Sequence, residues 1–466
     1  MKLVKSLLLG SAAGIAAVAG AHAADLPSRK AAPVEYVRVC SAYGAGFFYI
    51  PGTDTCLRVG GRVRAEYTVG SRFGDAQDAY GTRARGRLNI DARTATAYGT
   101  LRTFFRYELT NQSNFYGGSL AFNSGFIAPG LARQSSANFP GLNTLDLAFV
   151  QFGPITAGRA QSFFDFYAND FGFSTLRTAD SRLNLLAYTA TFGSGFSATV
   201  SLEDRVTGTG NRESVVATPL GATAAFLGQD YPDVVASLRV DQGWGSAQLS
   251  GAISQRKIAN TGPLLNGTKD ETAFAVQGGV KINLPMLAAG DTLVLQAAYA
   301  DGALGYLGWG GTNFVNSQQL GVGRITSPLT PLVVADFGVN GFGNTKSATG
   351  WSLVAAMRHF WTPQLRSELF GSYSELKLGY TLANQAVAGV VSRPLDPKEL
   401  IVGANLIWSP VSGLDIGVEV LYSRVELKQA VLATNDAGAR SALAAGGRLI
   451  KSDDAVAGRL RIQRDF

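Results

Sequence analysis

The chain has few cysteines, few histidines and few long apolar stretches. Its 466 residues include two Cys and two His, and two cysteines without a neighbouring histidine argue against a metal site. Beyond the first residues, no segment offers the roughly 18 continuous apolar residues that a membrane-spanning helix needs. A helical membrane protein is therefore excluded, and we expect neither a metal nor a cofactor.

The first residues are typical of an export signal. A short basic start, Met1 to Lys5, precedes an apolar stretch from Leu7 to Ala19, and "AHA" at positions 21–23 fits a small-residue cleavage site. The apolar stretch is too short for a membrane anchor. We expect residues 1–23 to form a signal peptide that is cleaved after Ala23, and the mature protein to be exported.

The mature chain is rich in short segments in which apolar and polar residues alternate. In the stretch "LRVGGRVRAEYTVG", residues 57–70, one parity holds Leu57, Val59 and Val63 and the other holds Arg58, Arg62 and Arg64. A side-chain period of two predicts a strand with one apolar and one basic face. No ordinary dry core would hold these guanidinium groups unpaired.

Sixteen alternating segments predict the fold, because their connections alternate between short and long. Strands are expected near 57–70, 83–93, 101–109, 144–153, 154–161, 183–193, 195–205, 232–242, 244–257, 271–284, 291–301, 347–361, 364–376, 398–408, 413–427 and 454–466. Long connections are expected at 71–81, 111–143, 162–182, 206–231, 258–270, 302–346, 377–397 and 428–453. This rhythm is typical of an outer-membrane barrel, and a sheet in a bilayer has to close. The predicted fold class is all-β: a transmembrane antiparallel 16-stranded β-barrel with short periplasmic turns and long external loops.

Aromatic residues gather where the short turns meet the strands. They are Phe152, Phe192, Trp244, Phe360, Trp361 and Trp408. Such a girdle is typical of the membrane interface of a barrel.

Arginine dominates the polar face of the first three strands and of the last one. The residues that share this parity are Arg58, Arg62, Arg64, Arg83, Arg85, Arg87, Arg93, Arg102, Arg106, Arg459 and Arg461. Closure of a barrel places the last strand beside the first, so these side chains would form one wall. In a water-filled lumen a guanidinium keeps most of its hydration, whereas a charge facing lipid costs about 2–4 kcal/mol at the midplane. We therefore expect the wall to face the lumen, and export together with membrane-type strands argues against a nucleic-acid groove.

Cys40 and Cys56 are the only cysteines, and fifteen residues separate them. In an exported chain they predict a disulfide, worth about 3 kcal/mol by loop closure. The enclosed residues would form either a compact cap or an inward-folded segment before the barrel. The expected domains are residues 1–23 (signal peptide), 24–56 (disulfide-looped segment) and 57–466 (barrel).

Four stretches resemble a known family. They are "PVEYVRVCSAYGAGFFYIPGTDTCLRVGGRVR" (33–64), "AGRAQSFFDFY" (157–167), "MRHFWTPQLRSELFGSY" (357–373) and "GRLRIQRDF" (458–466). The first resembles the N-terminal signature of the general porins of alphaproteobacteria, and the others resemble later landmarks of that family. The resemblance implies a sixteen-stranded, homotrimeric diffusion channel in the bacterial outer membrane, whose third external loop folds into the lumen.

The third long connection is suited to this role. Residues 162–182 hold Asp165, Asp170 and Asp180 among six aromatic residues. Aromatic side chains would anchor the loop and the acids would face the pore. We expect Asp165 and Asp170 to oppose the wall at the narrowest point, across from Arg62, Arg64, Arg85, Arg87, Arg102 and Arg106. With Arg58, Arg459 and Arg461, these residues form the predicted constriction, whose positive surplus predicts a slight preference for anions.

The sequence thus favours passive diffusion of small hydrophilic solutes and ions. The alternative is a substrate-specific uptake channel, for example for a sugar or an anion, although the lumen parity is mainly Arg, Gln, Ser and Thr instead of a continuous aromatic path. An enzyme is not expected, because His359 shares its parity with Trp351 and Leu353, on the side predicted to face lipid. The expected partners are further copies of the chain in a homotrimer, outer-membrane lipid, lipopolysaccharide and small solutes, and no nucleic acid.

Overall fold

The computed structural model describes most of the chain. The described residues are 38–71, 79–113, 142–205, 212, 215–217, 223–224, 227–259, 268–309, 334–339, 344–380, 394–432 and 449–466. The predicted signal peptide, 1–23, lies outside these residues. The chain divides into two compact units, Met1–Cys56 and Leu57–Phe466.

The first unit is closed by a disulfide. Cys40 and Cys56 are bonded to each other, as predicted, and both are buried together with Phe47. The 3-10 helix η2 (Ser41–Tyr43) and the short strand β1 (Phe48–Tyr49) lie between the two cysteines. The disulfide therefore closes a small core of its own.

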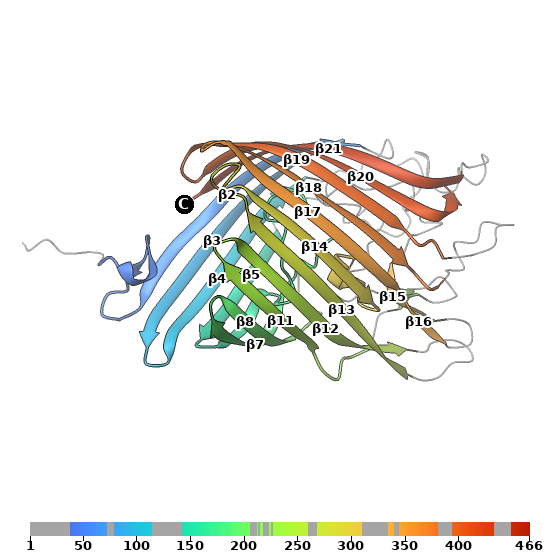
Figure 1. Cartoon of the computed structure of the whole chain (residues 1–466), viewed down its shortest axis with the longest axis horizontal. Helices are drawn as coiled ribbons and strands as arrows, with labels where there is room; N and C mark the ends of the chain where they lie inside the picture. Colours follow the sequence, from blue (N-terminus) through green and yellow to red (C-terminus); the bar gives the residue numbers. More distant parts are fainter. Residues whose placement is uncertain are drawn as a thin grey trace, which may run out of the picture. The chain divides into compact units, whose positions relative to one another are not determined.

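The second unit is a closed antiparallel barrel of steeply tilted strands (Figure 1). Within the described residues its sixteen strands are β2 (Cys56–Gly70), β3 (Tyr80–Thr96), β4 (Gly99–Gln112), β5 (Leu142–Phe152), β6 (Ile155–Gln161), β7 (Arg182–Gly193), β8 (Phe196–Glu203), β11 (Asp233–Gln242), β12 (Gly245–Ala259), β13 (Thr268–Asn283), β14 (Thr292–Asp301), β17 (Thr349–Thr362), β18 (Leu365–Lys377), β19 (Lys398–Val411), β20 (Leu414–Leu432) and β21 (Leu449–Asp465). Each pairs with its neighbour in chain order, and β2 pairs with β21 to close the barrel. The predicted 16-stranded barrel is confirmed.

The connections alternate as predicted. Tight turns close one end, and at Gly195 between β7 and β8 the backbone has φ +76° and a Cβ would overlap the carbonyl oxygen of Asp241. Only glycine satisfies both conditions without strain. The third, fourth and sixth long connections are named loop 3 (162–181), loop 4 (204–232) and loop 6 (302–348).

The strands present their apolar parity outward. Val59 and Val63 of β2 are 50% and 58% exposed, whereas Glu66 and Thr68 on the other parity are each 1% exposed. The exposed face next to the tight turns includes the predicted girdle residues Phe152, Phe192, Trp244, Trp361 and Trp408. For Val59, Val63, Arg62 and Arg64 the predicted register is confirmed, with the valines outside and the arginines inside.

Loops 4 and 6 contain structure that the sequence pattern does not predict. A small second sheet joins β9 (Val215–Ala217) and β10 (Thr223–Ala224) of loop 4 to β15 (Ala335–Val339) and β16 (Thr345–Ser347) of loop 6, with β9 and β15 parallel. Strands of two to five residues are too short to show alternation. Loop 6 also contains the 3-10 helix η4 (Leu304–Leu307).

The interior of the barrel has a dry side. Inward-facing residues of β11, β12, β13, β14, β18 and β20 pack against loop 6 in one hydrophobic cluster. Its wall contributes small side chains such as Ala273 and Ala300, and loop 6 contributes Leu304, Leu307 and Trp309, which are all nearly or fully buried. The space left for water therefore lies toward the arginine-bearing strands.

Candidate functional site

A cavity of about 640 Å³ lies between the arginine-bearing wall and loop 3. Its lining includes eleven arginines, Arg62, Arg64, Arg83, Arg85, Arg87, Arg106, Arg182, Arg358, Arg366, Arg459 and Arg461. It also includes seven carboxylates, Glu108, Asp146, Asp170, Asp180, Glu368, Asp415 and Asp465. The lining therefore holds a surplus of four positive charges.

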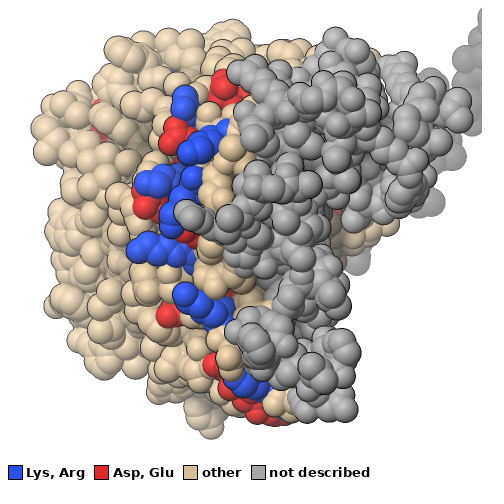
Figure 2. Space-filling view, turned by 90° about the vertical axis from the view of Figure 1, so that its right-hand side faces the viewer, with Lys and Arg blue, Asp and Glu red and all other residues tan. Residues whose placement is uncertain are grey.

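Figure 2 shows the face of the molecule on the right-hand side of Figure 1. On this face, basic and acidic side chains lie together in one band beside a mostly uncharged surface.

Strand register places most of these arginines next to acids. Glu66 of β2 lies opposite Arg461 of β21, and its carboxylate forms ion pairs with both Arg461, at 2.6 Å, and Arg83. On β4, Glu108 pairs with Arg87 at 2.5 Å and with Arg85 at 3.3 Å. Such cross-strand pairs hold the guanidinium groups extended along the wall.

Arg64 differs from its neighbours. It donates two hydrogen bonds, of 2.9 and 2.7 Å, to the side-chain oxygen of Gln463. Among the described residues, no carboxylate lies within ion-pair distance of it. Arg461, Arg62 and Arg85 are near enough to repel its guanidinium, and Glu66 attracts it from beyond ion-pair distance. Arg64 therefore has an amide, and not a carboxylate, as its direct partner.

Loop 3 forms the opposite side of the cavity with residues 168–175. The Phe173 amide donates to Glu419 of β20 at 2.5 Å, and the Phe173 carbonyl accepts from Arg459 at 2.6 Å and from Arg461 at 3.1 Å. Two aromatic rings of the loop contact arginines of the barrel. Arg461 of the wall is 3.9 Å from the Phe173 ring centre, and Arg358 of β17 is 4.3 Å from the Phe171 ring centre. The aromatic anchoring expected from the sequence is present, and it tethers the loop across the lumen.

In the part of the chain that the structure describes, no group of three or more His, Cys, Asp or Glu residues is placed to hold a metal ion. None of the described helices has the length and apolar character to cross a membrane.

Known proteins are similar to this chain both in sequence and in fold. Residues 25–449 match the family described as the porin subfamily. This chain belongs to the porin family.

Relatives of the porin are found in Brucella. Porin Omp2b of Brucella neotomae is 32% identical over 333 residues, which make up 68% of this chain and 82% of that protein. Porin Omp2b of Brucella abortus (strain 2308) is 33% identical over 318 residues, or 66% of this chain and 78% of that protein. The structure of the outer membrane channel DcaP of Acinetobacter baumannii has the same fold, with a TM-score of 0.57 at 15% identity, covering 90% of this chain and 99% of that one. The porin is an outer-membrane channel for passive diffusion.

The structure brings together most of the residues that the sequence predicts for the constriction of the porin. Those in the cavity lining are Arg62, Arg64, Arg85, Arg87, Arg106, Arg459, Arg461 and Asp170. Arg58 and Arg102 are not among the lining residues, and Arg102 instead forms an ion pair with Asp91 at 3.0 Å.

Asp165 also lies apart from the cavity lining. Its side chain is 2% exposed and its carboxylate lies 3.3 Å from Arg212 of loop 4. It accepts hydrogen bonds from the Ser181 amide at 2.7 Å and from Gln161 at 2.5 Å. Burial raises the pKa of Asp165 to about 8, because the charged form loses its hydration there. Asp165 closes the base of loop 3.

The sequence interpretation missed the acids that organise the wall of the porin. Glu66 and Glu108 share the parity of the arginines on β2 and β4, so the alternation itself places them inward. Arg358, Arg366 and Glu368 on β17 and β18 also line the cavity, and they lie within the stretch that resembles the family. Alternation gives the face of each residue but not the partner strand, which depends on register across the whole barrel.

The one histidine of the described chain is structural. His359 Nδ1 lies 2.6 Å from the carboxylate of Asp291, and its ring meets Trp361 edge to face at 4.5 Å. It sits beside the tight turn between β17 and β18, where the sequence places it. The aspartate fixes the orientation of the imidazole, which agrees with a role at the barrel rim.

Proposed function

We propose that the cavity between the arginine wall and loop 3 is the constriction of a general diffusion pore for small hydrophilic solutes and ions. The observation that supports it most is the cavity itself, whose lining holds eleven arginines and seven carboxylates. The partly exposed guanidinium groups of the wall, such as Arg62 at 27% and Arg85 at 23%, keep part of their hydration, so they stabilise passing anions at a lower cost than a fully buried charge.

The pore prefers anions slightly. The wall carries the arginines in excess while loop 3 contributes Asp170 to the opposite side, so a transverse field crosses the narrowest part and orients polar solutes. The Debye length of about 8 Å at physiological salt softens the preference without removing it.

A substrate-specific uptake channel is the second candidate. A specific sugar path would need a row of aromatic rings along the lumen, and the described lumen near the wall offers one stacked pair, Phe104 and Phe149, at 5.4 Å. This pair is covered by Arg102 and Arg106, and Phe104 is 8% exposed. The geometry therefore favours the general pore.

The proposal extends to processing and assembly. The family resemblance supports a homotrimer in contact with outer-membrane lipid and lipopolysaccharide, and a signal peptide cleaved after Ala23. Residues 24–56 then form the disulfide-looped segment that precedes the barrel, residues 57–466. The pore carries out no catalysis and needs no cofactor.

Two measurements on the purified protein test the function. Conductance in planar bilayers should rise linearly with salt concentration, and liposome swelling with a size series of neutral sugars should fall smoothly with solute size. A sharp preference for one solute, with saturation, would favour the substrate-specific channel instead.

A further inference from the structure

Loop 6 contacts both the amino-terminal and the carboxy-terminal arm of loop 3 inside the barrel. Residues Leu304–Trp309 of loop 6 comprise η4 and the two residues after it, and we call this segment the brace. Leu304, Tyr306 and Leu307 of the brace are completely buried. Its amino end is fixed to the small sheet, because the Leu304 amide donates to Asp336 of β15 at 2.9 Å.

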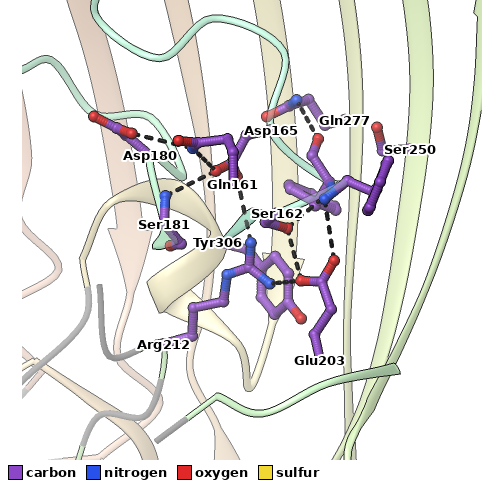
Figure 3. Close-up of polar contacts among 12 residues, drawn as sticks. Gln161, Ser162, Asp165, Asp180, Ser181, Glu203, Arg212, Ser250, Gln277 and Tyr306 are labelled. Carbon is purple, nitrogen blue, oxygen red and sulfur yellow. Dashed lines mark hydrogen bonds and ion pairs between the residues drawn. The ribbon is translucent and has the colours of Figure 1, made fainter. Parts of the chain in front are cut away.

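The first contact is with the amino-terminal arm of loop 3. The Tyr306 ring meets the Phe164 ring edge to face at 4.6 Å, and the Tyr306 hydroxyl donates to Asp233 of β11 at 2.8 Å. Arg212 of loop 4 lies 4.2 Å from the Tyr306 ring centre. Figure 3 shows Arg212 beside Tyr306 and bonded to Glu203, with Asp165 and Ser181 at the base of loop 3 nearby.

The second contact is with the carboxy-terminal arm, at Arg177. Its guanidinium lies flat on Trp309, 3.5 Å from the ring centre. It donates to the Gly308 carbonyl at 2.7 Å and forms a two-point ion pair with Glu399 of β19. The Trp309 indole N–H donates to Ser374 of β18 at 2.7 Å, which fixes the ring against that strand.

The two backbones also approach closely at this contact. A Cβ on Gly308 would lie 2.6 Å from the Thr178 carbonyl oxygen, and Gly308 has φ +77°. Glycine is therefore required for the brace to reach loop 3. The brace touches the loop at Phe164 and again at Arg177 and Thr178, and the residues between these points, 168–175, line the cavity.

We propose that the brace is a second inward-folded element that sets the position of loop 3, and that Trp309 is a positioning residue for the constriction. Trp309 acts through Arg177: its ring and the Glu399 carboxylate hold the guanidinium in one plane, and this fixes the arm that leads to the cavity. Removing the ring leaves Arg177 with an ion pair but no stacking surface. Loop 3 then moves away from the wall part of the time, and the channel widens.

The test compares Trp309→Ala with Trp309→Phe in planar bilayers and in liposome swelling with neutral sugars of increasing size. The matched control is Trp408→Ala, which removes an exposed tryptophan from the outer face of β19. We expect Trp309→Ala to raise the single-channel conductance and the open-channel noise, to admit larger sugars and to weaken the ion selectivity. Trp309→Phe, which keeps a ring under Arg177, should restore wild-type values, and Trp408→Ala should match wild type.

Wild-type conductance, size limit and selectivity in a folded Trp309→Ala barrel would overturn the proposal, as would equal changes in Trp408→Ala. If Trp309→Ala does not fold, Arg177→Lys decides the matter: it keeps the charge but loses the planar stack and the two-point ion pair, and it should raise noise and conductance, whereas wild-type behaviour would count against the brace. The inference rests on the proposed constriction, and the two fail differently. If substitutions in the arginine wall change selectivity while those in the brace change nothing, the constriction stands and the brace does not.

Discussion

Arg64 of β2 and Gln463 of β21 are joined by two hydrogen bonds across the seam that closes the barrel, at 2.9 and 2.7 Å. The amide neutralises no charge. Arg64 therefore lines the cavity without a carboxylate in ion-pair contact, beside arginines that are paired with acids, such as Arg62 with Asp465 and Arg87 with Glu108.

Arg64→Gln should therefore reduce the anion preference more than loss of a paired arginine does. A unit charge at 4 Å is worth about 1 kcal/mol in water and more beside a protein wall, which corresponds to a several-fold change in local ion partition. The measurement is the reversal potential in a potassium chloride gradient. Arg87→Gln is the comparison, because Arg87 is in the same lining and is paired with Glu108, and an equal shift in both variants would show that Arg64 has no special role.

Glu66 should matter for stability more than for selectivity. It is buried beneath the cavity and pairs with Arg83 and Arg461, so Glu66→Gln leaves two buried guanidinium groups without their carboxylate. Breaking a buried pair in this way costs about 3 kcal/mol. Urea unfolding of the purified barrel should show a lower midpoint, while Glu426→Gln, in an exposed pair with Arg424, should leave the midpoint where it was. No loss in Glu66→Gln would mean that the seam is not held by this carboxylate.

The burial of Asp165 predicts that the free energy of unfolding depends on pH near neutrality. Burial raises its pKa to about 8, helped by nearby Asp180 and Glu203 and opposed by Arg212 and the Ser181 amide. The unfolded chain, in which an aspartate has a pKa of about 4, binds this proton less strongly than the folded protein does. The free energy of unfolding therefore falls as the pH rises from about 4 to about 8, and this contribution is constant above that range.

Asp165→Asn should remove this dependence. The unfolding midpoint of the wild-type barrel should fall relative to that of Asp165→Asn between about pH 5 and about pH 8. Asp241→Asn, which alters an exposed pair with Arg239 at a tight turn, is the control and should follow the wild type. Parallel pH profiles for wild type and Asp165→Asn would show that the carboxyl titrates normally.

The barrel could be predicted from the sequence because every strand repeats one local rule. Val59, Val63, Arg62 and Arg64 each take the face that their parity predicts, and the disulfide follows from Cys40 and Cys56 being the only cysteines. A period of two does not depend on distant parts of the chain, so local pattern was enough.

The partners of loop 3 could not be predicted in the same way. Asp165 looks like Asp170 in the sequence, yet one is buried against Arg212 and the other lines the cavity. The difference comes from Arg212 of loop 4 and Tyr306 of loop 6, which lie together at the base of loop 3. Irregular segments without periodicity give no sequence signal for such contacts.

The most direct test of the account is chemical modification of Asp170→Cys during single-channel recording. Both native cysteines are in the disulfide, so the introduced thiol is the one available to a charged methanethiosulfonate reagent. If the cavity between loop 3 and the arginine wall is the constriction, attachment at position 170 lowers the conductance sharply. A positive reagent then raises the anion preference, and a negative reagent lowers it. Arg58→Cys, outside the cavity lining, should give a small change with either reagent. An unchanged conductance after complete modification at position 170 would contradict the account, because the narrowest part of the channel would then lie elsewhere.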